Sequence, residues 1–286
     1  MYKIVILGCE NSHANNFLKA VLQDKICEDI EFVGVYSHEP EAMQKLNAEF
    51  GVPMAESYED FVGKVDGIII TARHGDNHYK YAKPYLDSGI AMFIDKPITC
   101  TEEDAAEFMN ALKSRNVPVC GGSVCVLADY IRMLKQTVIS GEQGNIIGGY
   151  LRAPVMMQSP YGGFFFYSQH LVQVMTELFG CYPNSVQAFP NGKNYNCVVR
   201  YDDYDVNITF TQGNFLYYAS VSFEKAVVGD SYDVLNCFER EFMEFYRLLQ
   251  GEAQKQSYED FFAPVYVLNA IARSLESGKE ETVHRF

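Results

Sequence analysis

Two groups of side chains in this sequence have the chemistry of proton transfer. The first is the triplet Asp95-Lys96-Pro97, which directly follows an apolar run. A lysine in such a place can donate or accept a proton for a bound substrate. The second is His170, preceded closely by Tyr167 in a segment rich in aromatic residues. Each also has an ordinary structural interpretation, because the triplet can be a strand-ending turn and the histidine a core residue.

A third candidate is the turn at residues 8–13 (GCENSH), which follows the first apolar run. A dinucleotide-binding turn needs three glycines, for the bend, for close approach to the pyrophosphate and for helix packing. Only Gly8 is present, since Glu10 and His13 occupy the other two positions. Asn11 and Ser12 can nevertheless cap the next helix and leave its amides directed at an anion. The turn is therefore either a modified cofactor turn or merely a capped turn.

The end of the second apolar run carries the next determinant of cofactor binding. An acidic residue at this place binds the ribose hydroxyls of NAD. Here the chain has Ser37 followed by His38. A neutral hydroxyl beside an imidazole tolerates a 2′-phosphate, so the sequence slightly favours NADP over NAD.

The segment 71–78 (TARHGDNH) offers an alternative chemistry. His74, Asp76 and His78 stand at alternate positions, as metal ligands often do, and Glu10 and His13 are expected at the same sheet edge. This pattern would suit a metal-dependent lyase or hydrolase. Such triplets also occur by chance in loops, and we assign no metal to the chain.

The first 120 residues alternate between short apolar runs and segments with helical spacing. The strands are expected at 3–7, 31–36, 67–71, 90–94 and 117–120, and the helices at 13–24, 40–51, 77–88 and 102–115. This order predicts a Rossmann-type, doubly wound parallel sheet in an α/β fold.

The pattern changes after Gly121-Gly122. Helices are expected at 126–140, 168–178, 233–250 and 258–276, with extended segments at 147–157, 184–189, 195–201, 204–211 and 215–223. Alternation of period two in the extended segments is typical of an antiparallel sheet with one exposed face. The chain therefore divides into a Rossmann-type domain, residues 1–121, and an α+β domain with a mainly antiparallel open sheet, residues 122–286.

Composition excludes several classes of function. The 286 residues include 23 Lys and Arg against 37 Asp and Glu, a formal charge of −14. Such a chain repels nucleic acid and anionic membrane surfaces. The first residues lack a secretory signal and no apolar run is long enough to span a bilayer, so we expect a cytoplasmic protein. The eight cysteines are dispersed without a C-x-x-C pair, which disfavours a zinc knuckle.

The triplet at 95–97, in its strand context, resembles the signature of the Gfo/Idh/MocA family, which includes glucose–fructose oxidoreductase and inositol dehydrogenase. Residues 3–8, 31–53 and 57–97 are similar to the family's N-terminal domain in order and spacing. Residues 162–180 resemble the helix that carries the family's catalytic histidine, and residues 258–283 its C-terminal helix. The resemblance implies hydride transfer between a nicotinamide and a carbon–oxygen bond of a sugar, polyol or related molecule.

The resemblance also implies roles for single residues. Lys96 would lie near the reacting carbon and polarise or protonate the substrate oxygen, Asp95 would lie near the nicotinamide ribose, and Pro97 would fix the backbone through a cis bond. His170 would be the partner in proton transfer. The family's aspartate four residues before that histidine is Phe166 here, so Tyr167 or Tyr161 is expected to supply a hydroxyl instead.

The segment from Thr71 corresponds to the family's loop beneath the nicotinamide, without its usual proline. Together, the motifs and the resemblance assign these residues to cofactor binding: Gly8, Asn11, Ser12, His13, Ser37, His38, Thr71, Arg73, His78, Asp95, Lys96 and Pro97. Arg73 and His74 have the alternative of facing an anionic substrate group.

The leading hypothesis is a cytoplasmic NAD(P)-dependent oxidoreductase acting on a sugar-like small molecule with Lys96 and His170 as an acid–base pair. A second hypothesis is a small-molecule binding or regulatory protein that keeps the fold without the redox chemistry, because Glu10, His13 and Phe166 depart from the family pattern. Nucleic acid and membrane are not expected partners. Self-association into a homodimer or homotetramer through the aromatic sheet at residues 204–223 is expected.

Overall fold

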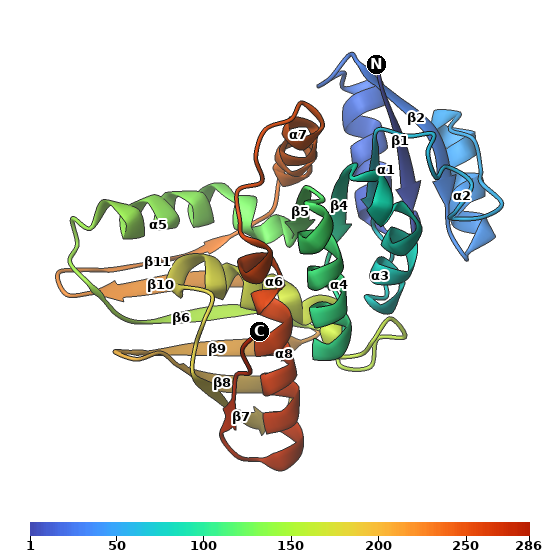
Figure 1. Ribbon diagram of the computed structural model, residues 1–286. Coiled ribbons are helices and arrows are strands. Elements are labelled where there is room, and N and C mark those ends of the chain that lie inside the picture. The colour runs from blue at the N-terminus through green and yellow to red at the C-terminus, as the bar shows by residue number, and fades with distance from the viewer. The chain divides into compact units, whose positions relative to one another are not determined.

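The computed structural model describes residues 1–286, which form two compact units (Figure 1). The first unit comprises Met1–Thr99, Glu103–Gly122 and Asn236–Phe261. The second comprises Cys100–Glu102, Ser123–Leu235 and Phe262–Phe286. A segment from the last quarter of the chain thus belongs to the compact unit of the N-terminal residues. No helix combines the length and apolar character needed to cross a membrane.

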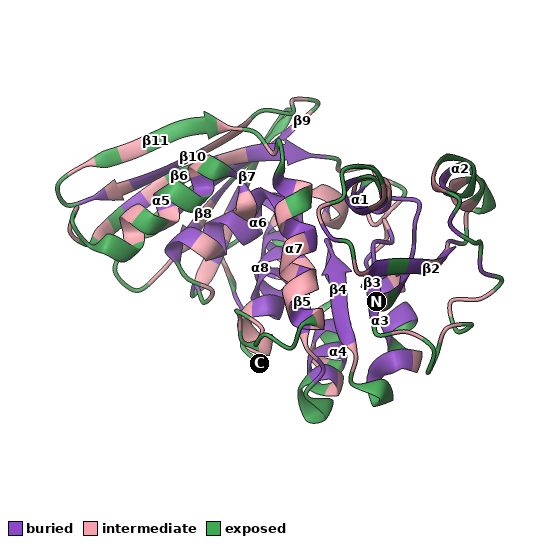
Figure 2. Cartoon of the chain, turned by 90° about the horizontal axis from the view of Figure 1, so that it is seen from above, coloured by how far each residue is buried: buried purple, intermediate pink, exposed green.

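The first unit contains a five-stranded sheet in the order β2-β1-β3-β4-β5, with all neighbours parallel. Its strands are β1 (Tyr2–Leu7), β2 (Ile30–Tyr36), β3 (Gly67–Ile70), β4 (Ala91–Asp95) and β5 (Val119–Gly122). Every residue of β3 and β4 is buried, as the purple colour of β4 shows in Figure 2. Continuous burial is expected of strands covered on both faces, and it confirms the doubly wound parallel sheet. The strand order reverses at β1, which has β2 on one side and β3 on the other. The carboxyl ends of these strands therefore form a topological switch point.

Helices connect these strands as the sequence predicts, with two changes of helix type. They are α1 (Ser12–Leu18), which continues as a π-helical turn at Lys19–Gln23, α2 (Pro40–Phe50), α3 (Asp76–Ala82), which continues as a 3₁₀ turn at Lys83–Ser88, and α4 (Glu102–Arg115). Pro40 begins α2 and Gly51 ends it with a left-handed φ of 72°. Both are the residues that favour these helix ends, which explains why the bounds of α2 were predictable.

Helix α7 (Cys237–Leu249) packs against α1, β4 and β5 of the first unit. Its orange-brown ribbon in Figure 1 therefore lies among blue and green elements from the start of the chain. Phe242 and Phe245 on its apolar face are completely buried and contact Phe17 and Phe93 edge to face. This aromatic packing fixes α7 on the sheet and determines which of its polar side chains face inward.

The second unit is built on a seven-stranded sheet in the order β11-β10-β6-β9-β8-β7-β12. Its strands are β6 (Ile146–Val155), β7 (Ser185–Asn191), β8 (Asn194–Arg200), β9 (Asp205–Gln212), β10 (Tyr217–Phe223), β11 (Val227–Tyr232) and β12 (Glu281–Thr282). All neighbours are antiparallel except β6 and β9. The mainly antiparallel sheet is confirmed, and the sequence missed only β11 and β12.

Three longer helices accompany this sheet: α5 (Asp129–Ser140), α6 (Phe165–Phe179) and α8 (Tyr258–Ser277). A short 3₁₀ helix at Val124–Leu127 precedes α5. Helix α6 packs on β6 and β9, and most of its residues are buried, as its purple ribbon in Figure 2 shows. A histidine on α6 is therefore held by protein on nearly every side.

Candidate functional site

The carboxyl ends of β1, β2 and β3 meet at the switch point, where Glu10 joins all three. Its carboxylate accepts the Ser37 hydroxyl at 2.7 Å through Oε2 and the Arg73 backbone N–H at 3.0 Å through Oε1. Glu10 is only 6% exposed. Its charge is thus held between the first turn, the tip of β2 and the loop after β3.

The turn itself is bent tightly against its neighbours. Gly8 has a φ of 76°, and a Cβ at this position would lie 2.4 Å from the backbone of Ala72. The amides of Gly8 and Cys9 donate to the Tyr36 carbonyl at 2.8 and 3.0 Å, while the Thr71 hydroxyl donates to the Gly8 carbonyl at 3.0 Å. Gly8 is therefore required for the close packing of the turn against the third-strand loop.

Asn11 occupies the N-cap position of α1, but its side chain makes no capping hydrogen bond. Instead, Asn11 Nδ2 donates to Asp95 Oδ2 at 2.7 Å, and Ser12 Oγ donates to Asn11 Oδ1 at 3.2 Å. The predicted side-chain cap is therefore wrong. The Asn11 side chain is oriented by its Nδ2 bond to the buried Asp95 carboxyl, and its Oδ1 accepts from Ser12 where a cap would accept a backbone N–H.

Asp95 lies at the end of β4 and is 0% exposed. Its Oδ1 accepts the backbone N–H of Lys96 at 2.7 Å, and its Oδ2 lies 4.0 Å from Lys96 Nζ. Loss of solvation raises the pKa of Asp95, whereas the nearby His13 and Lys96 oppose that rise. The Lys96–Pro97 peptide bond is cis, as the resemblance implies. The carboxylate therefore faces protein groups, with the lysine ammonium beside it.

His13 continues this row of polar groups into the interior. Its Nδ1 lies 3.3 Å from Asp95 Oδ2, and its Nε2 lies 3.1 Å from Oε2 of Glu241 on α7. Burial lowers the pKa of His13 to about 4, and burial raises the pKa of Glu241 well above its usual range. The rings of Phe17 and Phe238 contact the imidazole edge to face. His13 is therefore a neutral imidazole between two carboxyl groups.

Glu241 is a site residue that the sequence analysis missed. It is 3% exposed and lies on the same helix face as Phe238, Phe242 and Phe245. An acidic residue among apolar residues at helical spacing is a signal that could have revealed it, since a buried carboxyl needs a partner.

The raised pKa of Glu241 gives the chain a testable dependence of stability on pH. Below the unfolded pKa of 4.5, this carboxyl is protonated in both the folded and the unfolded state. As the pH rises above 4.5, the unfolded state releases the proton first, so the free energy of unfolding falls until the pH reaches the folded pKa. Glu241→Gln removes this titration. We expect its urea stability, relative to the unaltered protein, to increase between pH 5 and pH 7 by up to about 1.4 kcal/mol per pH unit.

The titration of His13 changes the stability in the opposite direction. Because its folded pKa is lowered to about 4, the free energy of unfolding rises as the pH increases from about 4 to 6.5. That contribution is common to both proteins, so the difference between them isolates Glu241. A difference that stays constant from pH 5 to pH 7 would mean that Glu241 is ionised in the folded state.

The proposed row of metal ligands is not formed. His78 is completely buried, with Nε2 2.7 Å from the Ala72 carbonyl and Nδ1 3.3 Å from the Ile98 carbonyl. Burial lowers its pKa to about 4. His74 instead lies beside Asp76, with Nδ1 3.6 Å from Oδ2. A neutral imidazole donates to only one of these two carbonyls, so His78 is a buried structural residue and does not serve as the third ligand beside His74 and Asp76.

In the second unit, His170 on α6 is oriented by a serine. Its Nδ1 lies 2.7 Å from Ser123 Oγ and 3.5 Å from Cys125 Sγ. Ser123 follows β5 directly, and its backbone N–H donates to Gln173 Oε1 at 2.7 Å. The Ser123 hydroxyl is thus a polar group that orients the imidazole from the end of β5. Ser123 was not among the residues predicted from the sequence.

Tyr167 contacts the His170 ring edge to face, with the ring centroids 4.9 Å apart. Burial raises the pKa of Tyr167, and a hydrogen bond with Tyr217 opposes that rise. Its phenol therefore stays protonated at neutral pH and can act as a donor. His170 and Tyr167 belong to the second unit and Lys96 to the first, so their joint action stays a prediction.

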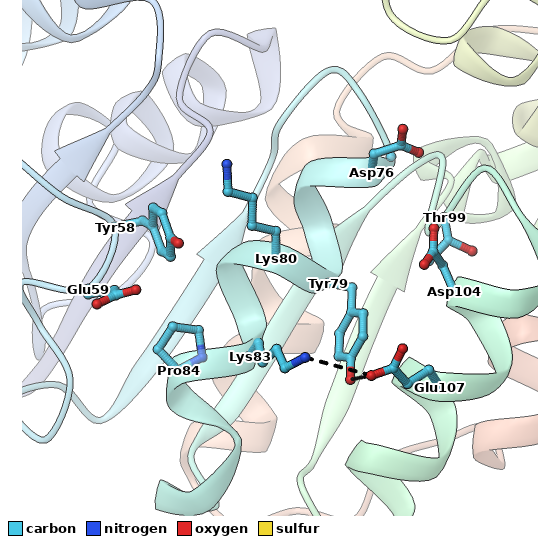
Figure 3. Close-up of a pocket in the computed structure, with 11 residues that line it drawn as sticks. Tyr58, Glu59, Asp76, Tyr79, Lys80, Lys83, Pro84, Thr99, Asp104 and Glu107 are labelled. Carbon is cyan, nitrogen blue, oxygen red and sulfur yellow. Dashed lines mark hydrogen bonds and ion pairs between the residues drawn. The ribbon is translucent and has the colours of Figure 1, made fainter.

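A surface pocket of ≈ 660 Å³ lies between α3 and α4 of the first unit (Figure 3). Figure 3 shows Glu107 at its wall, where Tyr79 donates to Glu107 at 2.8 Å and Lys83 lies 3.7 Å away. The dashed lines thus join a phenol and an ammonium group of the pocket to the Glu107 carboxylate. None of the predicted cofactor or proton-transfer residues lines it.

The switch-point edge and the β4 triplet define the first unit as a Rossmann-type domain of the kind that binds dinucleotides. A family model described as an oxidoreductase family with an NAD-binding Rossmann fold matches residues 2–122. The Rossmann-type domain of this chain thus matches the model of the Gfo/Idh/MocA oxidoreductase family, in agreement with the resemblance of its motifs. No curated protein matches the chain.

Solved structures share the fold over nearly the whole length. A myo-inositol dehydrogenase described as putative, from Sinorhizobium meliloti 1021, has a TM-score of 0.85 at 15% identity, covering 99% of this chain and 100% of that one. A scyllo-inositol dehydrogenase from Lactobacillus casei with bound NAD(H) and scyllo-inositol has a TM-score of 0.86 at 16% identity, covering 99% of both chains. A myo-inositol dehydrogenase from the same organism, with NAD(H) and myo-inositol, has a TM-score of 0.87 at 12% identity, covering 100% of this chain and 98% of that one.

Proposed function

We propose that the chain is an NAD-dependent dehydrogenase that oxidises or reduces a carbon–oxygen bond of a polyol or sugar-like substrate. The observation that carries the proposal is Lys96, which stands beside the buried Asp95 at the carboxyl end of β4 in a family Rossmann domain. The structural neighbours that bind inositol together with NAD(H) support this substrate class.

The donor and acceptor groups at the switch point are compatible with NAD. The ribose of NAD is commonly bound by a carboxylate near the tip of β2, and Glu10 brings one there, although the residue that follows β2 is Ser37. The Ser37 hydroxyl, on which the slight preference for NADP rested, donates to the Glu10 carboxylate, and this contact supports NAD in our proposal. The Glu10 carboxylate accepts hydrogen bonds at the tip of β2, as from the Arg73 amide, so it suits a ribose hydroxyl. Its negative charge repels a 2′-phosphate.

The proposed chemistry assigns one task to each side chain. A nicotinamide, when bound, supplies the hydride acceptor or donor. Lys96 binds the substrate oxygen and exchanges a proton with it through Nζ, and Asp95 balances the charge of the ammonium. His170, held through Nδ1 by Ser123, is the second proton-transfer group, and Tyr167 is a hydroxyl donor next to it.

Two further expectations accompany this function. We place the functional division at residues 1–121 for cofactor binding and 122–286 for substrate binding and assembly. Self-association would use the β9 and β10 region, residues 204–223, of the second-unit sheet. Light scattering after size-exclusion chromatography tests the assembly, and a mass near 32.4 kDa at all concentrations would contradict it.

A titration with each reduced cofactor tests the proposed function. NADH is expected to bind with enhanced fluorescence and more tightly than NADPH, and a panel of inositols and open-chain polyols with NAD is expected to yield NADH. If neither nucleotide binds at millimolar concentration, the dehydrogenase proposal fails. A melting temperature that rises with a polyol but with no nucleotide would favour a binding protein, for which Glu10 at the second glycine position is the supporting observation.

A further inference from the structure

The imidazole of His13 lies between two carboxyl groups in a part of the first unit that water does not reach. Asp95 Oδ2 is 3.3 Å from Nδ1, and Glu241 Oε2 is 3.1 Å from Nε2. A neutral imidazole carries one N–H and one lone pair, so it can donate to only one of the two oxygens. The other oxygen must bring a hydrogen of its own, because two lone pairs at this distance would repel each other.

The surroundings of the two carboxyl groups decide which one carries the proton. Asp95 has further donors, the amide of Asn11 at 2.7 Å and the backbone N–H of Lys96 at 2.7 Å, and the Lys96 ammonium at 4.0 Å. Glu241 Oε2 is buried, and neither it nor the two ring nitrogens of His13 has a hydrogen-bond partner of regular geometry, so His13 at 3.1 Å is a polar neighbour of this oxygen through its short distance alone. Negative charge is therefore better placed on Asp95, and the proton on Glu241.

We propose that Glu241 and His13 are positioning residues that hold the Asp95 carboxylate ionised beside Lys96. In this arrangement Glu241 donates its O–H to His13 Nε2, and His13 donates its Nδ1–H to Asp95 Oδ2. The significance of this arrangement for catalysis rests on the proposed function, in which Lys96 exchanges a proton with substrate. The two carboxyl groups thus hold one acidic proton between them. Its place on Glu241 leaves the negative charge on Asp95.

The groups that face this row support the same assignment. Lys96 is the cation that acts on His13, Asp95 and Glu241. Cys120 on β5 faces Glu241, and burial keeps its thiol neutral by raising its pKa well above the usual range. The rings of Phe17 and Phe238 contact the imidazole edge to face, and His13 is only 3% exposed. No second cation is present near Glu241 among the groups that influence its pKa.

Nitrogen-15 NMR of histidine-labelled protein tests the assignment without cofactor or substrate. The His13 signals are identified by their loss in a His13→Gln variant. We expect a neutral ring protonated at Nδ1 throughout pH 5.5–8. Glu241→Gln should retain this tautomer, because the Gln amide can donate to Nε2 as a protonated Glu does. An imidazolium, or a ring protonated at Nε2, in the unaltered protein would overturn the proposal.

Competitive acetylation of Lys96, followed by mass spectrometry, tests the effect on the lysine. In His13→Leu, Asp95 loses a donor and is more readily protonated, so Lys96 loses its counter-charge and its labelling rate at pH 8 should rise at least fivefold. Glu241→Gln should stay within twofold of the unaltered protein. An unchanged rate in a folded His13→Leu protein would contradict the positioning role, and if that variant does not fold, a more than twofold change in Glu241→Gln would do so. Neither measurement needs NAD, so a failure here is distinct from a failure of the dehydrogenase proposal.

Discussion

Replacing Lys96 with methionine is expected to lower kcat/KM for polyol oxidation by about 10²- to 10⁴-fold, the usual contribution of a positioned general acid or base. Methionine keeps much of the length of the lysine side chain and removes its proton. Asp95 keeps the backbone N–H of Lys96 and the Asn11 amide as donors, since neither depends on the lysine side chain. NADH binding should therefore change by less than about threefold, because the altered group acts on the substrate oxygen.

The matched control is Lys83→Met. Lys83 is an exposed lysine of the first unit that pairs with Glu107 at 3.7 Å and lines the surface pocket, and it has no part in the proposed chemistry. Its kcat/KM should stay within about twofold of the unaltered protein. Steady-state rates with NAD and the best polyol, measured beside NADH titrations, check both variants. A Lys96→Met enzyme with more than a tenth of the original kcat/KM would remove Lys96 from the proposed role.

The strands and helices that position this site were largely predictable because their signals are local. The apolar runs of β1, β3 and β4 are buried on both faces, and the ends of α2 depend on Pro40 and Gly51 themselves. Strand β11 was missed because it lacks such a local signal. Its residues are exposed or half-buried, so no alternation distinguishes it from a loop.

The partners of the polar side chains were not predictable, because they depend on tertiary contacts between distant segments. Asn11 has the residue type and position of a helix cap, yet its amide bonds Asp95, 84 residues further along. His13 likewise finds Glu241 on a helix that returns to the first unit from near the end of the chain. The Asp95-Lys96-Pro97 motif indicated where the chemistry lies, but only the packing of α7 shows what surrounds it.

The largest expected change in cofactor preference follows from Glu10→Gln. Two opposite or like unit charges about 4 Å apart interact by about 4 kcal/mol in partly buried surroundings, so a carboxylate at the tip of β2 strongly disfavours a 2′-phosphate. Removing the charge while keeping the shape should increase the ratio of NADPH to NADH affinity on the order of 100-fold, which corresponds to about 2.7 kcal/mol. The glutamine can still accept from Ser37 or from the Arg73 amide, so the three loops should keep their arrangement.

Calorimetric titration of both nucleotides measures this ratio without any turnover. Glu41→Gln is the control for a general loss of negative charge, because Glu41 is exposed in the first turn of α2 and should leave the ratio within about threefold. If Glu10→Gln weakens both nucleotides equally, the carboxylate holds the loops and does not read the ribose. If the ratio is unchanged while both still bind, the 2′-phosphate lies away from Glu10, and cofactor preference must come from elsewhere at the tip of β2, where the exposed His38 is the remaining titratable group beside Glu39.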